Sequence, residues 1–329
     1  MWVCTFHAMC VRMLRIDGAR LGYGDSFAIY DDDDSKRLVK SIMADLRIDE
    51  KRFPLNAVRS QISSAKNELL DPADFAARAN TPPEKVAASV YEELQRRLAR
   101  ANAMDFDDLL VNAYRLLRDN PDILEQYQER FRYISVDEYQ DTNRAQYQIT
   151  SLLAGKYQNL MVVGDDDQSI YSWRGADIRN ILDFEKDYPG AAVVKLEQNY
   201  RSTGHILDAA NAVVAHNTER KEKRLFTAAG EGEKVKVCLN RDEIAESNYI
   251  SGQIKGLHDK GVSYSDIALF YRTNAQSRVL EDGLVKAGIP YTIVGGTRFF
   301  DRMEIRDLTA YLKLAVNPSD DVSARRVIN

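Results

Sequence analysis

Two stretches decide the fold of this chain, Val136-Asp-Glu-Tyr-Gln-Asp-Thr-Asn143 and Val163-Gly-Asp-Asp-Asp-Gln-Ser-Ile-Tyr-Ser-Trp-Arg-Gly-Ala176. Each follows a short apolar run, 133–136 or 160–163, that ends abruptly in acidic or polar residues. A buried parallel strand delivers functional side chains to its carboxyl end in this way. The pattern predicts an α/β fold in which the chemistry lies at the strand tips.

The adjacent carboxylates of Asp137 and Glu138 can serve different purposes, because neighbouring residues after a strand point to different sides of the chain. A single carboxylate, together with phosphate oxygens and water, is the usual protein ligand of Mg²⁺ at a nucleoside triphosphate. Asp137 suits that role, and Glu138 suits a general base that orients water. A lone pair of this kind is more often a solvated acidic loop. The flanking residues favour a site.

Three ordered motifs resemble motifs II, III and IV of the UvrD/PcrA/Rep group of superfamily 1 DNA helicases. They are residues 137–143, residues 164–176 and Gln198-Asn-Tyr-Arg-Ser202. Further matches lie at 5–10, 105–109, 272–278, 295–300 and 302–307, so the resemblance runs nearly end to end. It implies ATP and Mg²⁺ as cofactors. It also implies 3′-to-5′ translocation on single-stranded DNA and unwinding at duplex junctions, in repair or replication.

The resemblance assigns the nucleotide chemistry to five residues. It places Asp137 at Mg²⁺, Glu138 as catalytic base, and Gln168 at the γ-phosphate or the attacking water. In motif IV, Tyr200 would stack on adenine and Arg201 would reach the γ-phosphate from the opposite domain. In isolation, the Tyr200 and Arg201 pair would be interpreted as packing between domains.

A second set of residues is implied in DNA binding. Thr5 and His7 match family residues that touch single-stranded DNA. Trp173 would stack on a base, with Tyr171 and Arg174 supporting the strand. Outside this context His7 would be interpreted as a capping or core histidine. Tyr171 and Trp173 would be interpreted as packing in a domain interface.

No Gly-x-x-x-x-Gly-Lys-Ser/Thr phosphate loop occurs in the 329 residues. The family places that loop before the motif that begins here at Thr5, and places motifs V and VI beyond a region that resembles 317–321. We therefore expect an internal fragment that neither hydrolyses ATP nor unwinds DNA by itself. The alternative is a non-catalytic module that binds single-stranded DNA or nucleotide. A missing sheet strand would also leave an exposed edge through which chains could self-associate.

The resemblance predicts two incomplete RecA-like, P-loop NTPase motor domains and one inserted domain. Residues 1–20 and 104–190 form partial domain 1A, residues 21–103 form the all-helical accessory domain 1B, and residues 191–329 form partial domain 2A without a 2B insertion. Strands are expected at 2–6, 133–137, 160–165, 191–196, 234–240, 266–271 and 291–294. Helices are expected at 35–46, 56–69, 84–100, 142–153, 203–215, 242–258 and 275–287.

Composition sets further limits. A net charge of −5 with 44% apolar residues is typical of a cytoplasmic protein and argues mildly against nonspecific binding of nucleic acid by the whole surface. The three cysteines and four scattered histidines lack paired ligand spacing, which predicts reduced thiols and no structural zinc. No membrane span or signal peptide is expected. The segment 217–233, with Arg220-Lys-Glu-Lys-Arg224, is predicted to be a solvated connection.

Overall fold

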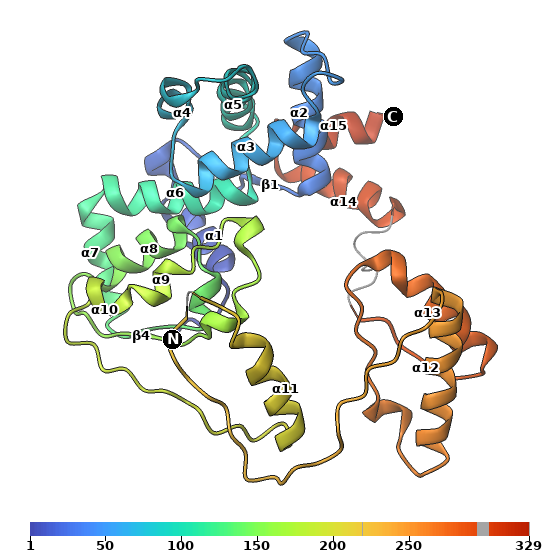
Figure 1. Ribbon diagram of the computed structural model, residues 1–329. Helices are drawn as coiled ribbons and strands as arrows, with labels where there is room; N and C mark the ends of the chain where they lie inside the picture. Colours follow the sequence, from blue (N-terminus) through green and yellow to red (C-terminus); the bar gives the residue numbers. More distant parts are fainter. Residues whose placement is uncertain (219, 295–302, 329) are drawn as a thin grey trace. The chain divides into compact units, whose positions relative to one another are not determined.

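The computed structural model describes residues 1–218, 220–294 and 303–328. The chain divides into two compact units (Figure 1). The first contains Met1–Lys195, Val214–Lys223 and Met303–Asn329, and the second contains Leu196–Val213 and Arg224–Arg302. Among the described residues, none of the helices combines the length and the apolar character that crossing a membrane requires.

One hydrophobic core of the first unit lies among four helices, α1 (Phe6–Asp17), α6 (Phe106–Asp119), α7 (Pro121–Arg130) and α8 (Arg144–Ala154). Apolar residues recur along α6 at helical spacing, so they form one stripe that packs against α1 and α8. Residues buried in this core include Cys10, Met13, Leu14, Leu109, Leu116, Leu117, Ile149 and Leu153.

A second core of the same unit is formed by α2 (Asp32–Asp45), α3 (Leu55–Asn67), α4 (Pro72–Arg78) and α5 (Pro82–Arg100). The predicted helices of this region are confirmed. Residues 21–103 are nevertheless not all-helical, because β1 (Ala28–Tyr30) pairs in parallel with β2 (Ala103–Asp105). That pairing joins the two ends of the helical segment, so no local pattern could reveal it.

A second parallel pair carries the motifs at 136–143 and 163–176. β3 (Ile134–Val136) pairs with β4 (Leu160–Val162), and α8 connects them, which confirms the predicted strand-helix-strand order. The strand predicted at 2–6 is wrong. Residues 1–5 belong to no strand, because they pair with none of the described strands. The Thr5 hydroxyl accepts a hydrogen bond of 3.3 Å from the Ala8 N–H and so caps the start of α1.

Short helical turns connect these elements. They are the 3₁₀ helices η1 (Gly18–Leu21), η2 (Tyr139–Asp141), η3 (Asp166–Gln168), η4 (Ser172–Arg174) and η5 (Tyr264–Asp266), with the short helices α9 (Arg179–Leu182) and α10 (Phe184–Asp187).

The second unit holds three predicted helices, α11 (Gly204–Val214), α12 (Glu243–His258) and α13 (Asn274–Lys286). The strands predicted at 191–196, 234–240, 266–271 and 291–294 are wrong, because these described residues form no hydrogen-bonded ladder. Alternating apolar residues indicate a segment that is able to join a sheet, but it becomes a strand only when it forms hydrogen bonds with a neighbouring strand. Val237 is 86% exposed and Leu239 97% exposed, in keeping with unpaired segments.

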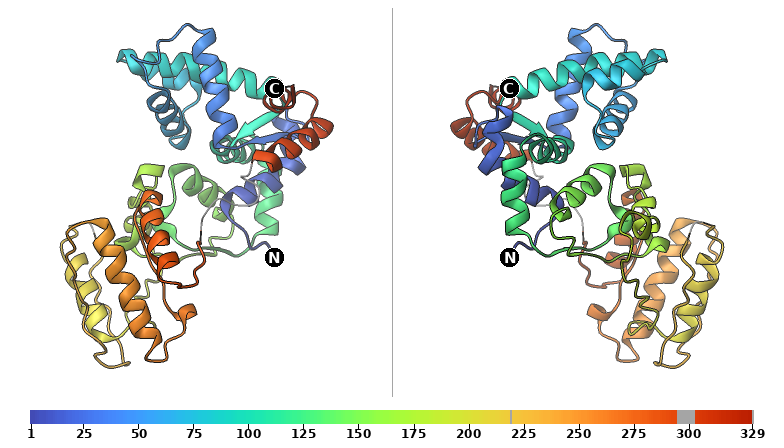
Figure 2. Two further views of the ribbon diagram at one scale, coloured as in Figure 1. Left: turned by 90° about the vertical axis from the view of Figure 1, so that its right-hand side faces the viewer. Right: turned by 90° about the vertical axis from the view of Figure 1, so that its left-hand side faces the viewer.

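The last two helices pack with the first unit, beside α2 in the views of Figures 1 and 2. They are α14 (Met303–Val316) and α15 (Asp321–Ile328). Asp320 accepts a buried hydrogen bond of 2.8 Å from the Tyr30 hydroxyl, and Arg306 pairs with Asp31 at 2.5 Å. The compact units therefore divide the chain differently from the predicted boundary, which assigns 303–329 to domain 2A.

Candidate functional site

Glu138 lies directly after β3 in a left-handed backbone conformation, with φ 52° and ψ 43°. This conformation costs a residue other than glycine on the order of 1 kcal/mol, so its surroundings must hold it in place. The Glu138 N–H donates to Asp137 Oδ1 at 2.9 Å, and the Tyr139 N–H donates to the Val163 carbonyl at 2.9 Å. The turn leaves the side chains of Asp137 and Glu138 exposed at the strand tip.

Gln140, which is only 1% exposed, joins the ends of β3 and β4. Its Nε2 donates to Glu138 Oε2 at 2.8 Å, and its Oε1 accepts from the Asp165 N–H at 3.0 Å. A Cβ atom at position 164 would stand 2.5 Å from Gln140 Oε1, so Gly164 is required for this approach. No role was predicted for Gln140, although it lies only two residues after the predicted catalytic carboxylate of Glu138.

Gln168 lies at the same strand tips. Its Nε2 donates to Asp165 Oδ2 at 2.7 Å, while Asp165 Oδ1 accepts from the Asp167 N–H at 3.0 Å. The hydrogen bonds thus run from Glu138 through Gln140 and Asp165 to Gln168. The structure brings together the predicted nucleotide residues of motifs II and III.

The segment 220–223 is not a solvated connection. Arg220 Nη2 lies 2.8 Å from Asp167 Oδ2, and Lys223 Nζ contacts both Asp165 and Asp166. Burial opposes ionisation of Asp165, but hydrogen bonds from Lys223 and Gln168 outweigh it and lower the pKa of that carboxyl. The prediction was wrong because the acidic partners lie far away in sequence.

Asp137 is suited to Mg²⁺. One carboxylate oxygen accepts the N–H of Glu138, and the other accepts no hydrogen bond from any described residue. An exposed oxygen of this kind can join phosphate and water oxygens around a hard cation. The residue present therefore fits the implied ion.

The predicted DNA residues Thr5 and His7 lie at the start of α1, where Thr5 acts as the cap. The His7 ring meets the ring of Phe106 edge to face, with centroids 5.8 Å apart, and burial lowers the pKa of His7. Phe106 is 50% exposed at the first position of α6. Sequence reasoning gave it no role, although an aromatic residue within a capping box, Asp105 to Asp108, was a usable signal.

Trp173 is 68% exposed in η4, and its ring centroid lies 6.3 Å from that of Tyr171. Gly175 follows with φ 84°, a conformation that favours glycine, and a Cβ there would stand 3.3 Å from Asn67 Cγ. The loop is therefore seated closely on α3. The side chain of Arg174 lies outside the described part of the structure.

Tyr200 and Arg201 belong to the second unit, whereas Asp137, Glu138 and Gln168 belong to the first. Both are exposed, Tyr200 by 83%. Asn199 Oδ1 accepts the N–H groups of Arg201 at 2.9 Å and Ser202 at 2.7 Å, which shapes the turn that presents them. Their closure over a nucleotide stays a prediction.

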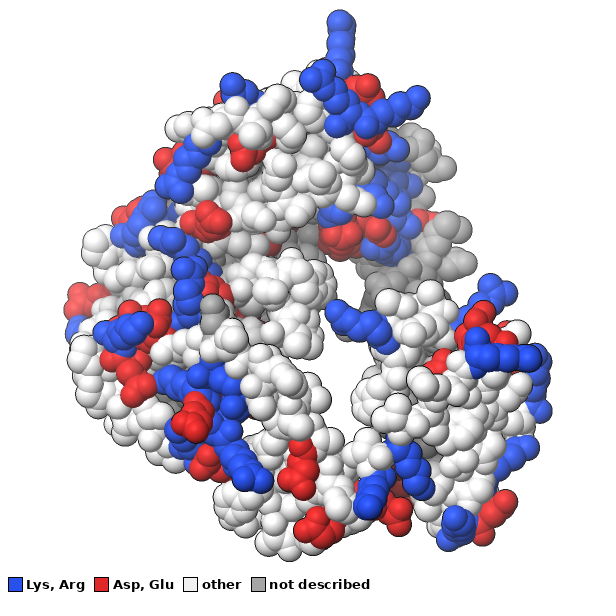
Figure 3. Space-filling view, in the orientation of Figure 1, with Lys and Arg blue, Asp and Glu red and all other residues white. Residues whose placement is uncertain are grey.

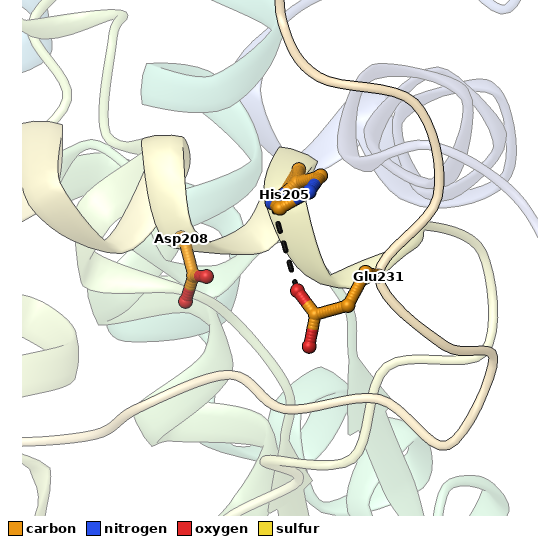
Figure 4. A group of neighbouring side chains, drawn as sticks. All are labelled: His205, Asp208 and Glu231. Atoms are coloured by element: carbon orange, nitrogen blue, oxygen red, sulfur yellow. Dashed lines mark ion pairs between the residues drawn. The ribbon is translucent and has the colours of Figure 1, made fainter.

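Figure 3 shows Lys and Arg side chains interspersed with Asp and Glu on the face that it presents, rather than one continuous basic surface there. Figure 4 shows a separate group in the second unit, His205, Asp208 and Glu231, whose potential ligand atoms lie within 4.8 Å of one another. His205 is thus less isolated than its sequence spacing indicated. Its Nδ1 lies 3.6 Å from Glu231 Oε2, and both carboxylates of the group are exposed.

Comparison with known proteins gives two family matches. The UvrD/REP helicase N-terminal domain model matches residues 1–189, and the UvrD-like helicase C-terminal domain model matches residues 194–329. ATP-dependent DNA helicase PcrA of Bacillus subtilis strain 168 is 50% identical over 329 residues, which is 100% of this chain and 44% of that protein. PcrA of Staphylococcus aureus strain COL is 50% identical over 328 residues, which is 100% of this chain and 45% of that protein.

The chain therefore spans less than half the length of these relatives. The matches imply a RecA-like motor fold of mixed α/β content, in agreement with the parallel strand pairs. The chain belongs to the UvrD/Rep family of superfamily 1 helicases.

Proposed function

We propose that these residues are part of an ATP-dependent DNA helicase. It translocates 3′ to 5′ on single-stranded DNA and unwinds duplex DNA in repair or replication. The observation that carries the proposal is the continuous hydrogen-bonded path from Glu138 through Gln140 and Asp165 to Gln168. This path places two motifs that are far apart in sequence at one pair of strand tips.

The nucleotide roles follow from the chemistry of each group. Asp137 would hold Mg²⁺, which neutralises charge on the phosphates when bound. Glu138 engages Gln140 through Oε2 and keeps its carboxylate exposed, so it can accept a proton from water. Gln168 can then orient that water or sense the γ-phosphate. Tyr200 would stack on adenine, and Arg201 would stabilise charge on the transferred phosphoryl group.

The DNA roles rest on exposed aromatic rings. Trp173 offers a face on which a base can stack, with a contribution of about 1–3 kcal/mol. Tyr171 and Arg174 would support the strand, and Thr5 and His7 would contact it at the start of α1. Phe106 adds a second exposed ring, beside His7. Trp173 lies a few residues from Gln168 in the sequence, so a displacement of one residue would move the other.

The domain scheme is also part of the proposal. Domain 1A would comprise 1–20 and 104–190, inserted domain 1B 21–103, and domain 2A 191–329, with both motor domains incomplete. The separate cores around α6 and around α5 support the distinction between 1A and 1B. These 329 residues contain no phosphate-loop sequence, so we expect no ATP hydrolysis from them alone. Single-stranded DNA binding without turnover is the second candidate activity, which the exposed Trp173 favours.

The test measures ATP turnover by this chain with and without single-stranded DNA, beside Glu138→Gln. Circular dichroism establishes that both samples are folded. The proposal expects no turnover from either. DNA-stimulated turnover that is lost in Glu138→Gln would overturn the predicted inactivity of this chain and support the role of Glu138. Turnover that is equal in both proteins would contradict that role.

A further inference from the structure

Three consecutive carboxylates, Asp165 to Asp167, lie next to Gln168 in and before the single turn η3. Asp166 and Asp167 are only 8% and 6% exposed in their side chains. Like charges at this spacing repel one another, and burial raises the cost of keeping each ionised. This acidic triplet therefore needs cations to hold its shape.

The cations come from the basic segment 220–223. The Arg220 guanidinium donates two hydrogen bonds to the Asp167 carboxylate, from Nε to Oδ1 at 3.0 Å and from Nη2 to Oδ2 at 2.8 Å. The Lys221 N–H donates to Asp166 Oδ2 at 2.8 Å. Arg220 and Lys223 are partly buried, with side chains 17% and 18% exposed, so solvent screens these pairs less than fully exposed pairs.

Asp165 connects this segment to the candidate nucleotide site. Its Oδ1 accepts from Lys223 Nζ, and its Oδ2 accepts from Gln168 Nε2 at 2.7 Å. One carboxylate thus fixes both side chains. A rotation of Asp165 that followed loss of Lys223 would release the Gln168 amide.

We propose that Lys223 and Arg220 are positioning residues for Gln168, acting through the acidic triplet. The inference rests on the proposed role of Gln168 in sensing nucleotide. The segment is also where the chain passes between compact units, since 214–223 group with the first unit and the residues from Arg224 with the second. A displacement of residues 220–223 would therefore shift Asp165 and change the position of the Gln168 side chain.

The test measures the chemical shift of the Gln168 side-chain amide, which depends on its hydrogen bonds. Protein labelled with ¹⁵N at glutamine gives side-chain amide signals, and Gln168→Ala identifies the signal of interest. Lys223→Met and Asp165→Asn should each shift that signal, and the double variant should shift it no further than Asp165→Asn alone. Lys223→Arg, which keeps the charge, should restore most of the original shift. Lys236→Met, an exposed lysine elsewhere, is the matched control and should change nothing.

An unmoved Gln168 signal in folded Lys223→Met, or additive shifts in the double variant, would overturn the proposal. Arg220→Met provides a second variant if Lys223→Met does not fold. It should move the same signal, and an unmoved signal counts equally against the inference. The spectra need neither nucleotide nor DNA, so failure of the proposed function would leave this result unaffected and the two failures can be told apart.

Discussion

The side-chain amide of Gln140 donates to Glu138 Oε2 at 2.8 Å while both residues lie in the turn that follows β3. The same side chain accepts the Asp165 N–H, so one buried glutamine sets the relation between the two motifs. Both the nitrogen and the oxygen of this buried side-chain amide form hydrogen bonds. Removal of the side chain would leave Glu138 Oε2 and the Asp165 N–H without these partners, which costs stability.

Replacement of Gln140 by Ala should therefore lower the free energy of unfolding by about 1–3 kcal/mol. Urea denaturation followed by circular dichroism measures the change. Gln126→Ala, at an exposed glutamine of α7, is the control and should stay within about 0.5 kcal/mol of the parent. Equal stability of the two variants would mean that the Gln140 bridge does not stabilise the fold.

Lys66 should be one of the most sensitive positions in the chain. Its side chain is fully buried, and Nζ lies 2.6 Å from Asp105 Oδ2 and 2.8 Å from Asp108 Oδ1. Lys66→Met leaves two buried carboxylates without their cation, so we expect destabilisation of about 3–5 kcal/mol. The measurement is thermal and urea denaturation, with Lys40→Met on the surface of α2 as control. A loss as small as that of the control would refute this account of the cluster.

The same cluster predicts a pH dependence. Burial, and then the nearby charge of Asp105, raise the pKa of Asp108 to about 6 from 3.8. Between these values the folded state binds more protons than the unfolded state, so the contribution of Asp108 to stability falls as pH rises through this window. Asp108→Asn should remove that component.

Urea denaturation at pH 4.5, 5.5 and 6.5, values chosen to span roughly this window, compares the parent with Asp108→Asn. The parent should lose more stability than the variant as pH rises. Parallel pH profiles would show that Asp108 titrates normally.

Self-association is a fourth expectation. Within the described residues, β3 and β4 form a sheet of two strands, and Met161 of β4 is 58% exposed. An unpaired edge of this kind is a template for strand pairing between chains. Light scattering should show association that grows with concentration and that Met161→Lys reduces. A parent that stays monomeric across the concentration range would rule the idea out.

Local patterns in the sequence predicted the strands β3 and β4 and seven of the longer helices, which are α2, α3, α5, α8, α11, α12 and α13. The apolar stripe of α6 and the acidic ends at Asp137 and Asp165 are visible without any knowledge of tertiary contacts. β1 was missed because its partner, β2, lies at the other end of the helical segment. The pairing of Arg220 with Asp167 was missed for the same reason, since opposite charges indicate a contact only once the fold brings them together.

The role of Trp173 in binding single-stranded DNA offers the most direct test of the central claim that this chain carries the DNA-contacting machinery of a helicase. Fluorescence anisotropy of a labelled oligo-dT measures binding by the parent, by Trp173→Ala and by Phe270→Ala, an exposed aromatic of the second unit. We expect Trp173→Ala to weaken binding by about tenfold or more, and Phe270→Ala to leave it unchanged. Equal binding by all three folded proteins, or no binding by the folded parent, would contradict the account.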